Sequence, residues 1–466
     1  MQIEMGFKGM KTETIAAIST AMNSSGIGII RISGDESFEI ADKMYYSKSG
    51  KKLSDMPTHT IHYGFIKDGQ EMIDEVLVML MRAPRSFTAE DTVEINCHGG
   101  VYAMKRILEL AVKSGARYAE PGEFTKRAFL NGRIDLSQAE AVIDVIQAKN
   151  EYALKSSVSQ LRGSVLKVIN NLRSRILYET AFIESALDDP EHISLEGYPE
   201  ELEKRLQDMK KELAGLIKSS ENGKRIKEGI KTVIAGKPNA GKSSLLNLLL
   251  REERAIVTDI AGTTRDTLEE DITVNGIGLT VIDTAGIRST QDVVEKIGVE
   301  KAKNYVQEAD LILYVVDSAT GFDENDEQIM QMIEDKKAIV LLNKTDLCPV
   351  TTEEMVRQRM NKPVIPISAK TTNGLDLLEK MIRDMFYEGK ISFNDEIYIT
   401  NMRQKAALES AFESLCRVEE SIRANMPEDF FSIDLMSAYE ELGNITGESV
   451  GEDLVNEIFG RFCMGK

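Results

Sequence analysis

A phosphate-binding loop constrains this chain more than any other feature of its sequence. Residues 236–243 read Gly-Lys-Pro-Asn-Ala-Gly-Lys-Ser, which satisfies the pattern GxxxxGK[ST]. The β-branched run Lys231–Ala235 precedes the loop and the leucine-rich run Ser244–Leu250 follows it, so we expect a strand, a glycine loop and a helix. Backbone N–H groups and the helix dipole of such a loop bind a β-phosphate. Lys242 then reaches the β- and γ-oxygens, and Ser243 ligates magnesium.

Three further nucleotide-binding motifs follow the loop in the order that a GTPase requires. Each comes directly after an apolar, strand-like run, and they are Asp283–Gly286, Asn343–Asp346 and Ser368–Lys370. The Asp283 carboxylate is expected near the metal, and the Gly286 backbone near the γ-phosphate. Asp346 can accept both N–H groups on the edge of guanine, which adenine does not offer. The ordered set therefore predicts GTP rather than ATP.

These motifs do not identify the group that positions the attacking water. Ras-like switches place a glutamine after the DxxG glycine, but this chain has Ile287, which neither donates nor accepts a hydrogen bond. Arg265 and Arg288 are candidates for an arginine finger, and each is more simply explained as a solvated surface charge. Asn239 and the hydroxyl-rich run Thr258–Thr264 offer hard oxygen ligands that suit an alkali cation.

Length and composition limit the remaining possibilities. At 466 residues the chain exceeds one hydrophobic core and predicts about three domains. No run approaches the roughly 20 apolar residues of a membrane span, and charges interrupt Met1–Ile15, so we expect a cytoplasmic protein with no membrane association. Four cysteines without a CxxC pair favour neither a zinc site nor a disulfide framework. The net charge of −19 opposes a broad electrostatic grip on nucleic acid, so RNA would be held by a local basic patch, the near-neutral N-terminal part or a partner protein.

The periodicity of apolar residues predicts a multidomain protein of α+β and α/β type. Strand-like runs and a helical stretch, Tyr102–Lys113, indicate an N-terminal α+β domain. A capping box at Ser137-x-x-Glu140 and apolar residues spaced by four and three from Leu154 to Leu172 then predict long packed helices. Helical patterns return after about residue 390, so the simplest interpretation is an all-α helical domain interrupted by a Ras-like P-loop GTPase domain. The predicted boundaries are 1–130 for the N-terminal domain, 131–223 and 391–466 for the two parts of the helical domain, and 224–390 for the inserted domain.

Four longer segments make the chain similar to a known family. They are Gly26–Gly34, Arg82–Gly100, Pro121–Gly132 and the C-terminal Phe462-Cys-Met-Gly-Lys466. The chain resembles the MnmE family, also called TrmE, over all but about its first ten residues. The resemblance implies that the N-terminal domain binds a tetrahydrofolate and forms a homodimer. It also implies that two GTPase modules of the dimer meet across a potassium-containing interface.

The resemblance further implies chemistry beyond GTP hydrolysis. Members of this family act with an FAD-containing partner, MnmG, to add an aminomethyl or carboxymethylaminomethyl group to carbon five of the wobble uridine of certain tRNAs. A tetrahydrofolate derivative supplies the one-carbon unit, and GTP turnover drives a conformational cycle. The implied assembly is a heterotetramer in which this chain binds GTP, Mg²⁺ and K⁺, while FAD is held only by the partner.

The family's functional positions transfer to this sequence residue by residue. The nucleotide positions are Asn239, Ala240, Gly241, Lys242, Ser243, Ser244, Thr258, Asp259, Ile260, Ala261, Gly262, Thr263, Thr264, Asp283, Thr284, Ala285, Gly286, Asn343, Lys344, Thr345, Asp346, Ser368, Ala369 and Lys370. Among them, magnesium is expected on Ser243 and Thr264, and potassium on Asn239, Thr258, Ile260 and Thr263. The catalytic, water-positioning acid matches Glu295, which without the resemblance is an ordinary helix-face carboxylate beside Lys296.

The family's folate contacts match Arg31, Glu94, Arg133 and Lys466. A carboxylate such as Glu94 suits the paired N–H donors of a pterin edge, and cations suit a glutamyl tail. Relatives often carry lysine where Arg133 stands, which keeps the charge and changes the geometry of its hydrogen bonds.

A second class of function fits the nucleotide motifs alone. A nucleotide-operated RNA or ribosome assembly switch would bind RNA without modifying it. A KH-type GXXG loop or a second GTPase module would favour such a switch, and the organisation of the chain indicates neither. Binding of a reduced folate is the property that separates the two functions.

Overall fold

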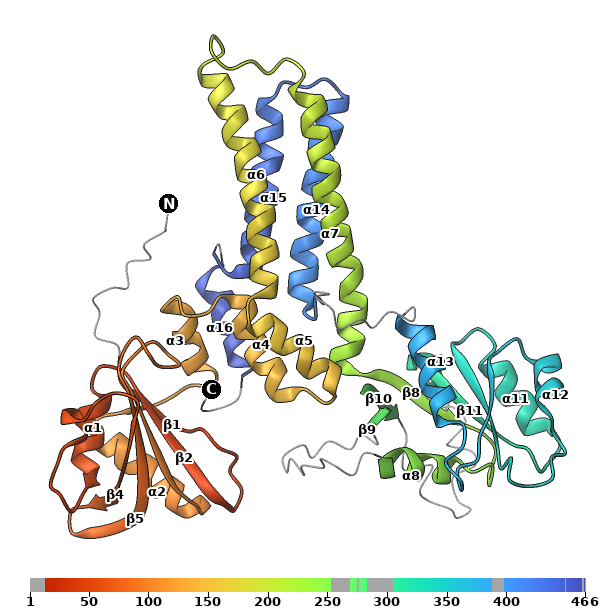
Figure 1. Cartoon of the computed structure of the whole chain (residues 1–466), viewed down its shortest axis with the longest axis horizontal. Helices are drawn as coiled ribbons and strands as arrows, with labels where there is room; N and C mark the ends of the chain where they lie inside the picture. The colour runs from red at the N-terminus through yellow and green to blue at the C-terminus, as the bar shows by residue number, and fades with distance from the viewer. Residues whose placement is uncertain are drawn as a thin grey trace. The chain divides into compact units, whose positions relative to one another are not determined.

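The computed structural model describes residues 13–252, 269–274, 276–282, 305–387, 398–448, 450–462 and 465 (Figure 1). The chain forms two compact units. The first comprises residues 1–143, 161–170 and 442–466, and the second comprises residues 144–160 and 171–441. The expected multidomain α+β and α/β class is confirmed.

A seven-stranded sheet forms the core of the first unit, in the order β3-β4-β5-β6-β2-β1-β7. All described neighbours are antiparallel except β1 and β7, which are parallel. Side chains alternate along β2, where Ile30 and Ile32 are fully buried and Arg31 between them points to the other face. The strands and helices of this part are β1 (Ile15–Ile18), β2 (Ser25–Ser33), α1 (Ser37–Met44), β3 (Tyr45–Tyr46), the 3₁₀ turn Leu53–Asp55, β4 (Thr60–Asp68), β5 (Glu71–Met81), β6 (Thr92–Gly99), α2 (Val101–Lys113), β7 (Arg117–Tyr118) and α3 (Glu123–Leu130).

Helix α4 (Leu136–Gln147) begins two residues earlier than the predicted capping box allows. Asp135 caps it, because its Oδ1 accepts hydrogen bonds from the backbone N–H groups of Ser137 (2.7 Å) and Gln138 (3.2 Å). The capping box predicted at Ser137 is therefore wrong, and Glu140 is buried within the helix instead. The final helix of the unit, α16 (Glu452–Gly460), packs against α3.

The predicted helical run from residue 154 to residue 172 is two helices, α5 (Glu151–Leu161) and α6 (Ser164–Asp188). Gly163 lies between them and has a φ of +83°. Glycine adopts a positive φ readily because it has no Cβ. Leu154, the first residue of the expected apolar stripe, is exposed, and α5 instead buries Ala153, Ser157 and Gln160. The pattern identified helices correctly but assigned the wrong face to α5.

Four long helices pack together (Figure 1). In the sequence, two of them precede the inserted sheet and two follow it. Helices α6 and α7 (Tyr198–Glu228) precede the sheet, and α14 (Met402–Arg423) and α15 (Asp429–Thr446) follow it. Arg175 of α6 pairs with Glu212 of α7 at 2.9 Å, and Arg417 of α14 pairs with Asp434 of α15 at 2.8 Å. Helix α7 also packs against α14, where Lys210 pairs with Glu419 at 2.6 Å, so the two segments of the chain form one bundle.

The sheet between α7 and α14 has the order β13-β12-β11-β8-β10-β9. Its described strands are parallel except β9, which pairs antiparallel with β10. Every residue of the central strand β11 is buried, as expected for a parallel strand covered on both faces. The elements are β8 (Ile230–Ala235), α8 (Lys242–Glu252), β9 (Glu269–Val274), β10 (Ile277–Ile282), β11 (Leu311–Asp317), α11 (Glu324–Met332), β12 (Ala338–Asn343), α12 (Glu353–Arg359), β13 (Val364–Pro366) and α13 (Leu375–Tyr387).

Two glycines of α7 make a matched test of this packing. A Cβ at Gly223 would lie 2.2 Å from the carbonyl oxygen of Ile399, whereas nothing lies within 4 Å of a Cβ at Gly215. We expect Gly223→Ala to destabilise the protein by about 1–3 kcal/mol, because the backbone must move. Gly215→Ala should stabilise it by up to about 1 kcal/mol through helix propensity. Thermal unfolding checks both, and equal shifts in the two variants would contradict the described contact.

Candidate nucleotide-binding site

The phosphate loop lies between β8 and α8, as the sequence predicts. Gly236 and Gly241 have φ values of +150° and +101°. A Cβ at Gly236 would lie 2.5 Å from the carbonyl oxygen of Val315, and one at Gly241 would lie 2.1 Å from the amide nitrogen of Asn343. Both positions therefore require glycine, since a side chain would collide with a neighbouring strand or motif.

The side chain of Asn343 joins three of the predicted motifs. It stands at the end of β12 and is only 2% exposed. Its Nδ2 donates to the carbonyl oxygen of Ala240 at 2.9 Å, and its Oδ1 accepts from the backbone N–H of Ala369 at 3.1 Å. One buried amide thus holds the phosphate loop, the Asn343–Asp346 motif and the Ser368–Lys370 motif together.

Lys344 holds the phosphate loop at a second point. Its Nζ donates to the carbonyl oxygen of Asn239 at 2.9 Å and pairs with the buried carboxylate of Asp317 at 2.6 Å. Asn239 and Lys344 both adopt positive φ values, +64° and +65°. Such conformations are costly for residues other than glycine, so the surrounding hydrogen bonds must maintain them.

Lys242 at the start of α8 is prepared for an anionic ligand. Its Nζ donates to the carbonyl oxygens of Gly236 (2.7 Å) and Lys237 (2.9 Å), both in the phosphate loop. Burial lowers the pKa of Lys242, because the loop supplies dipoles around the ammonium rather than a full negative charge. A phosphate in the loop would supply that charge. Ser243 follows in the first turn of the helix, and Ser244 is exposed.

The expected base-binding residues lie at the same edge of the sheet. Ser368 is buried, and its hydroxyl donates to Oδ1 of Asp346 at 2.9 Å. This bond orients a carboxylate that is otherwise exposed to solvent. Thr345 is fastened by its own hydroxyl to the carbonyl oxygen of Ile367, and Lys370 is exposed.

The remaining predicted nucleotide and catalytic residues lie outside the described residues. They are Thr258–Thr264, Asp283–Gly286 and Glu295. Strand β10 ends at Ile282, directly before Asp283, and runs parallel to β8.

Sequence reasoning missed a buried network that begins at Lys237, the second residue of the phosphate loop. Its Nζ donates to Oδ2 of Asp326 (2.9 Å), Oδ2 of Asp323 (3.2 Å) and the carbonyl oxygen of Gly321 (2.9 Å). Asp326 is fully buried, and its second oxygen accepts from the Tyr314 hydroxyl at 2.8 Å. The available signal was the capping pair Asp323-x-x-Asp326 at the start of α11, but nothing in the sequence connects it to a lysine almost ninety residues earlier.

Electrostatics favour the charged form of this network. Burial acts to lower the pKa of Lys237, but hydrogen bonds and charge from Asp326 and Asp323 outweigh it and raise that pKa. The pKa of Asp323 is lowered, first by the backbone N–H of Asp326 and then by Lys237. The ammonium of Lys237 therefore remains charged and ties the phosphate loop to α11.

Three of the predicted folate residues come together in the first unit. Arg31 on β2 stands opposite Glu94 on β6, and its Nη2 lies 2.7 Å from Oε1 of Glu94, with both side chains about one-tenth exposed. The guanidinium groups of Arg31 and Arg133 lie 5.7 Å and 5.1 Å from the centre of the Phe87 ring. Lys466 lies outside the described residues, but the carbonyl oxygen of the adjacent Gly465 accepts from Arg31 at 3.3 Å.

A second buried ionic network lies beside the Arg31–Glu94 ion pair. Sequence reasoning did not predict this network. Ser33 and Thr92 form a cross-strand pair two positions along from Arg31 and Glu94, on the same face of the sheet. The Ser33 hydroxyl donates to Glu90 at 2.8 Å, and Glu90 pairs with the buried guanidinium of Arg127 at 3.1 Å. These charges neutralise one another, as buried charges must.

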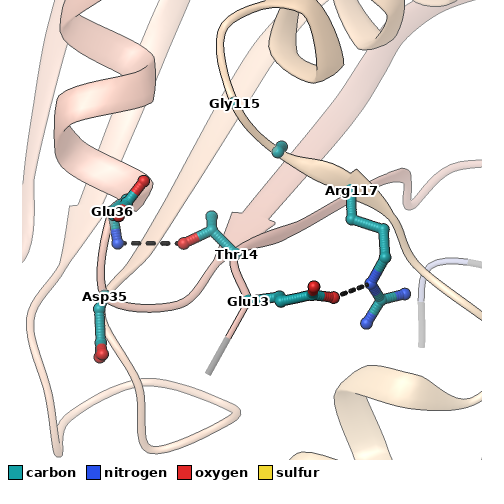
Figure 2. A pocket seen from close by; sticks show the side chains of 7 residues that line it. Glu13, Thr14, Asp35, Glu36, Gly115 and Arg117 are labelled. Carbon is teal, nitrogen blue, oxygen red and sulfur yellow. Dashed lines mark hydrogen bonds and ion pairs between the residues drawn. The ribbon is translucent and has the colours of Figure 1, made fainter. Parts of the chain in front are cut away.

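One cavity of the first unit contains none of the predicted residues. It has a volume of about 300 Å³ and is lined by Glu13, Thr14, Asp35, Glu36, Gly115, Ala116 and Arg117 (Figure 2). Arg117 pairs with Glu13 at 2.8 Å, and the Thr14 hydroxyl accepts from the backbone N–H of Glu36 at 3.0 Å.

Among the described residues, no helix is both long and apolar enough to cross a membrane.

Comparison with known proteins gives two family matches that together span most of the chain. Residues 14–133 match the N-terminus of the GTP-binding protein TrmE, and residues 136–463 match the MnmE helical domain. Several curated relatives carry the name tRNA modification GTPase MnmE. The protein of Lachnoclostridium phytofermentans is 61% identical over 98% of this chain and 100% of its own length, and that of Acetivibrio thermocellus is 50% identical over the same shares.

The Lys237 network yields a prediction about nucleotide binding. We expect Lys237→Met to weaken GTP binding about tenfold, equivalent to about 1.4 kcal/mol, because the loop loses its bond to α11. Lys237→Arg keeps the charge and should restore most of the affinity. Lys231→Met, at an exposed lysine on β8, is the matched control. Calorimetry measures the three affinities, and a Met variant that unfolds at a lower temperature but binds GTP normally would limit Lys237 to a structural role.

Proposed function

The chain belongs to the MnmE family of tRNA modification GTPases, and from this membership we propose its detailed activity. It is a potassium-dependent GTP hydrolase that works with an FAD-containing, MnmG-type partner. Together they add an aminomethyl or carboxymethylaminomethyl group to carbon five of the wobble uridine of certain tRNAs, with a tetrahydrofolate derivative as one-carbon donor. The observation that carries the nucleotide half of this proposal is the buried Asn343 amide that unites three motifs around one phosphate loop.

Guanine selection is assigned to Asp346. Its carboxylate is held by the Ser368 hydroxyl and can accept the two N–H groups of a guanine edge. Adenine presents no such pair of donors, so it would leave the carboxylate without a partner. Lys344 and Asn343 fix this motif to the phosphate loop, so base and phosphates are bound by one connected structure.

Two cations complete the proposed site. Ser243 and Thr264 would hold magnesium, which neutralises charge on the β- and γ-phosphates when bound. Asn239, Thr258, Ile260 and Thr263 would hold potassium. The carbonyl oxygen of Asn239 is already bonded to Lys344, so its amide oxygen is the group available to a cation. Amide and hydroxyl oxygens are suitable ligands for a hard cation.

The proposed folate site is built from Arg31, Glu94, Arg133 and Lys466. Phe87 lies beside the guanidinium groups of Arg31 and Arg133 and offers a flat surface to a pterin ring. The Glu94 carboxylate suits the paired N–H donors of that ring, and the cations suit a glutamyl tail. The ring of Phe87 and the charges of Arg31, Glu94 and Arg133 support this proposal.

A homodimer is proposed through the N-terminal sheet. Ile61 and Tyr63 on β4 are 64% and 53% exposed, and Leu77 on β5 is 48% exposed. Tyr63 stands opposite Leu77 in the strand register, so these side chains share one face. An apolar face of this kind is typical of a protein interface.

The proposed domain borders remain those inferred from the sequence, 1–130, 131–223, 224–390 and 391–466. Helix α7 ends at Glu228 and β8 begins at Ile230, so α7 extends five residues beyond the proposed border between 223 and 224. Helix α13 ends at Tyr387 and α14 begins at Met402, so the proposed border between 390 and 391 lies between two helices. We also propose a cytoplasmic location, where tRNA and the partner protein are available.

Folate binding tests the proposal against an assembly switch. We expect the protein to bind tetrahydrofolate, and Glu94→Gln to weaken that binding about tenfold because one acceptor becomes a donor. Glu109→Gln, at an exposed position on α2, should bind normally. Fluorescence or calorimetric titration measures the affinities. Absence of any folate binding in the unaltered protein would favour the switch.

Potassium dependence tests the proposed catalytic cycle. GTP hydrolysis should accelerate at least about tenfold when potassium replaces sodium at constant ionic strength, because the ion compensates developing negative charge. Glu295→Ala should slow hydrolysis while leaving GTP affinity nearly unchanged, and the exposed Glu334→Ala should do neither. Steady-state rates measure these effects. Equal rates in both salts would remove potassium from the account, and a fully active Glu295→Ala variant would remove Glu295.

A further inference from the structure

The hairpin β9–β10 connects two segments that carry expected nucleotide motifs. Strand β9 begins at Glu269, shortly after Thr258–Thr264, and β10 ends at Ile282, directly before Asp283–Gly286. The two strands are paired from Glu269–Ile282 to Val274–Ile277, so the hairpin moves as one piece. Any displacement of either motif on binding or hydrolysis of GTP would therefore pull on the hairpin.

The hairpin packs against the first turn of α5 and the two residues just before it. We name this the α5–hairpin contact and define it by Lys149, Asn150 and Tyr152 on one side and Asp271, Gly276 and Gly278 on the other. A Cβ at Gly276 would lie 2.9 Å from the Tyr152 ring, and a Cβ at Gly278 would lie 2.6 Å from the amide nitrogen of Asn150. Lys149 pairs with Asp271 at 2.7 Å. Because glycine has no Cβ, the side chains of Tyr152 and Asn150 can pack directly against the hairpin backbone.

The contact continues into a shared hydrophobic core. Ala153 of α5 is 4% exposed and belongs to the same buried cluster as Ile272, Ile277 and Leu279 of the hairpin. Tyr152 is partly buried against this cluster. Close-packed side chains transmit displacements, because an interior of this density has little free space to absorb them.

Asn150 is held rigidly at the centre of the contact. Its Oδ1 accepts from the backbone N–H of Ala153 at 2.8 Å, and its Nδ2 donates to the carbonyl oxygen of Ile226 at 3.1 Å. The hydroxyl of Thr280 on β10 donates to the carbonyl oxygen of Glu228, also at 3.1 Å. The hairpin is thus hydrogen-bonded to the end of α7, where the chain enters the sheet, and Asn150 joins that end of α7 to the start of α5.

The other end of α5 holds the segment by which the chain leaves the inserted domain. Gln160 donates to the carbonyl oxygen of Tyr398 (2.9 Å) and to the hydroxyl of Thr400 (3.1 Å). Thr400 in turn donates to the buried carboxylate of Asp144 at 3.2 Å, and Lys227 pairs with Asp144 at 2.7 Å. Helix α5 therefore connects the hairpin with the two segments through which the chain enters and leaves the inserted domain.

We propose that the α5–hairpin contact couples the nucleotide state of the GTPase domain to the helical domain. The proposal rests on the proposed function, in which GTP turnover drives tRNA modification. Tyr152 and Asn150 act as positioning residues: neither is among the proposed nucleotide or folate residues, and they pass movement of the hairpin to α5. Their loss should separate hydrolysis from modification, since the nucleotide residues themselves remain intact.

Tyr152→Ala provides the direct test, with Tyr178→Ala as its matched control. Tyr178 is 62% exposed on α6 and outside the contact. We expect Tyr152→Ala in the full chain to keep potassium-stimulated GTP hydrolysis within about twofold and to lose at least about tenfold in tRNA modification, assayed with the FAD partner, tetrahydrofolate donor and tRNA. The control should keep both activities. A Tyr152→Ala protein whose two activities stay normal, or fall in proportion, would overturn the coupling role.

A second measurement does not depend on modification. Hydrogen–deuterium exchange in the unaltered protein should differ along α5 between GDP and a non-hydrolysable GTP analogue, and Tyr152→Ala should abolish the difference. Identical exchange of α5 in both nucleotide states would overturn the proposal even if tRNA is modified. If the unaltered protein hydrolyses GTP without modifying tRNA, the proposed function fails, and this measurement still decides the coupling.

Discussion

The nucleotide site depends on one buried side-chain amide, that of Asn343. A side chain with one donor and one acceptor group can join two backbone segments at once, and here it joins the phosphate loop to the segment after β13. Because the amide is almost fully buried, loss of either bond would leave a polar group unsatisfied, at a cost of about 1–3 kcal/mol. The glycine at position 241 is a consequence, since any side chain there would displace the amide.

Two lysines hold the phosphate loop at two further points. Lys344 holds Asn239 and is paired with Asp317, while Lys237 is paired with Asp323 and Asp326. Both partners are fixed on the sheet or on α11, so the loop is held in place before a nucleotide arrives. Such preorganisation reduces the ordering cost of binding. In the proposed site, a bound phosphate would then only have to satisfy Lys242 and the backbone N–H groups.

Local motifs made much of this predictable, and long-range contacts did not. The strands before each motif and the helix after the loop could be predicted because the motifs fix their spacing to those elements. The pairing of Lys237 with Asp326 could not, because a charge pair leaves no periodic signal in the sequence. The start of α4 was misplaced because Asp135 and Ser137 are both good capping residues. The face of α5 was misassigned because its buried positions include Ser157 and Gln160, which an apolar pattern overlooks.

We propose that one connected structure binds guanine and the phosphates together. Calorimetric titration of the full chain with GDP and ADP tests it most directly, combined with the variant Asp346→Asn. GDP should bind at least about a hundredfold more tightly than ADP, and the variant should lose GDP and gain xanthosine diphosphate, because its amide presents a donor to the base. Equal affinity for GDP and ADP, or unchanged GDP binding in the variant, would contradict the account.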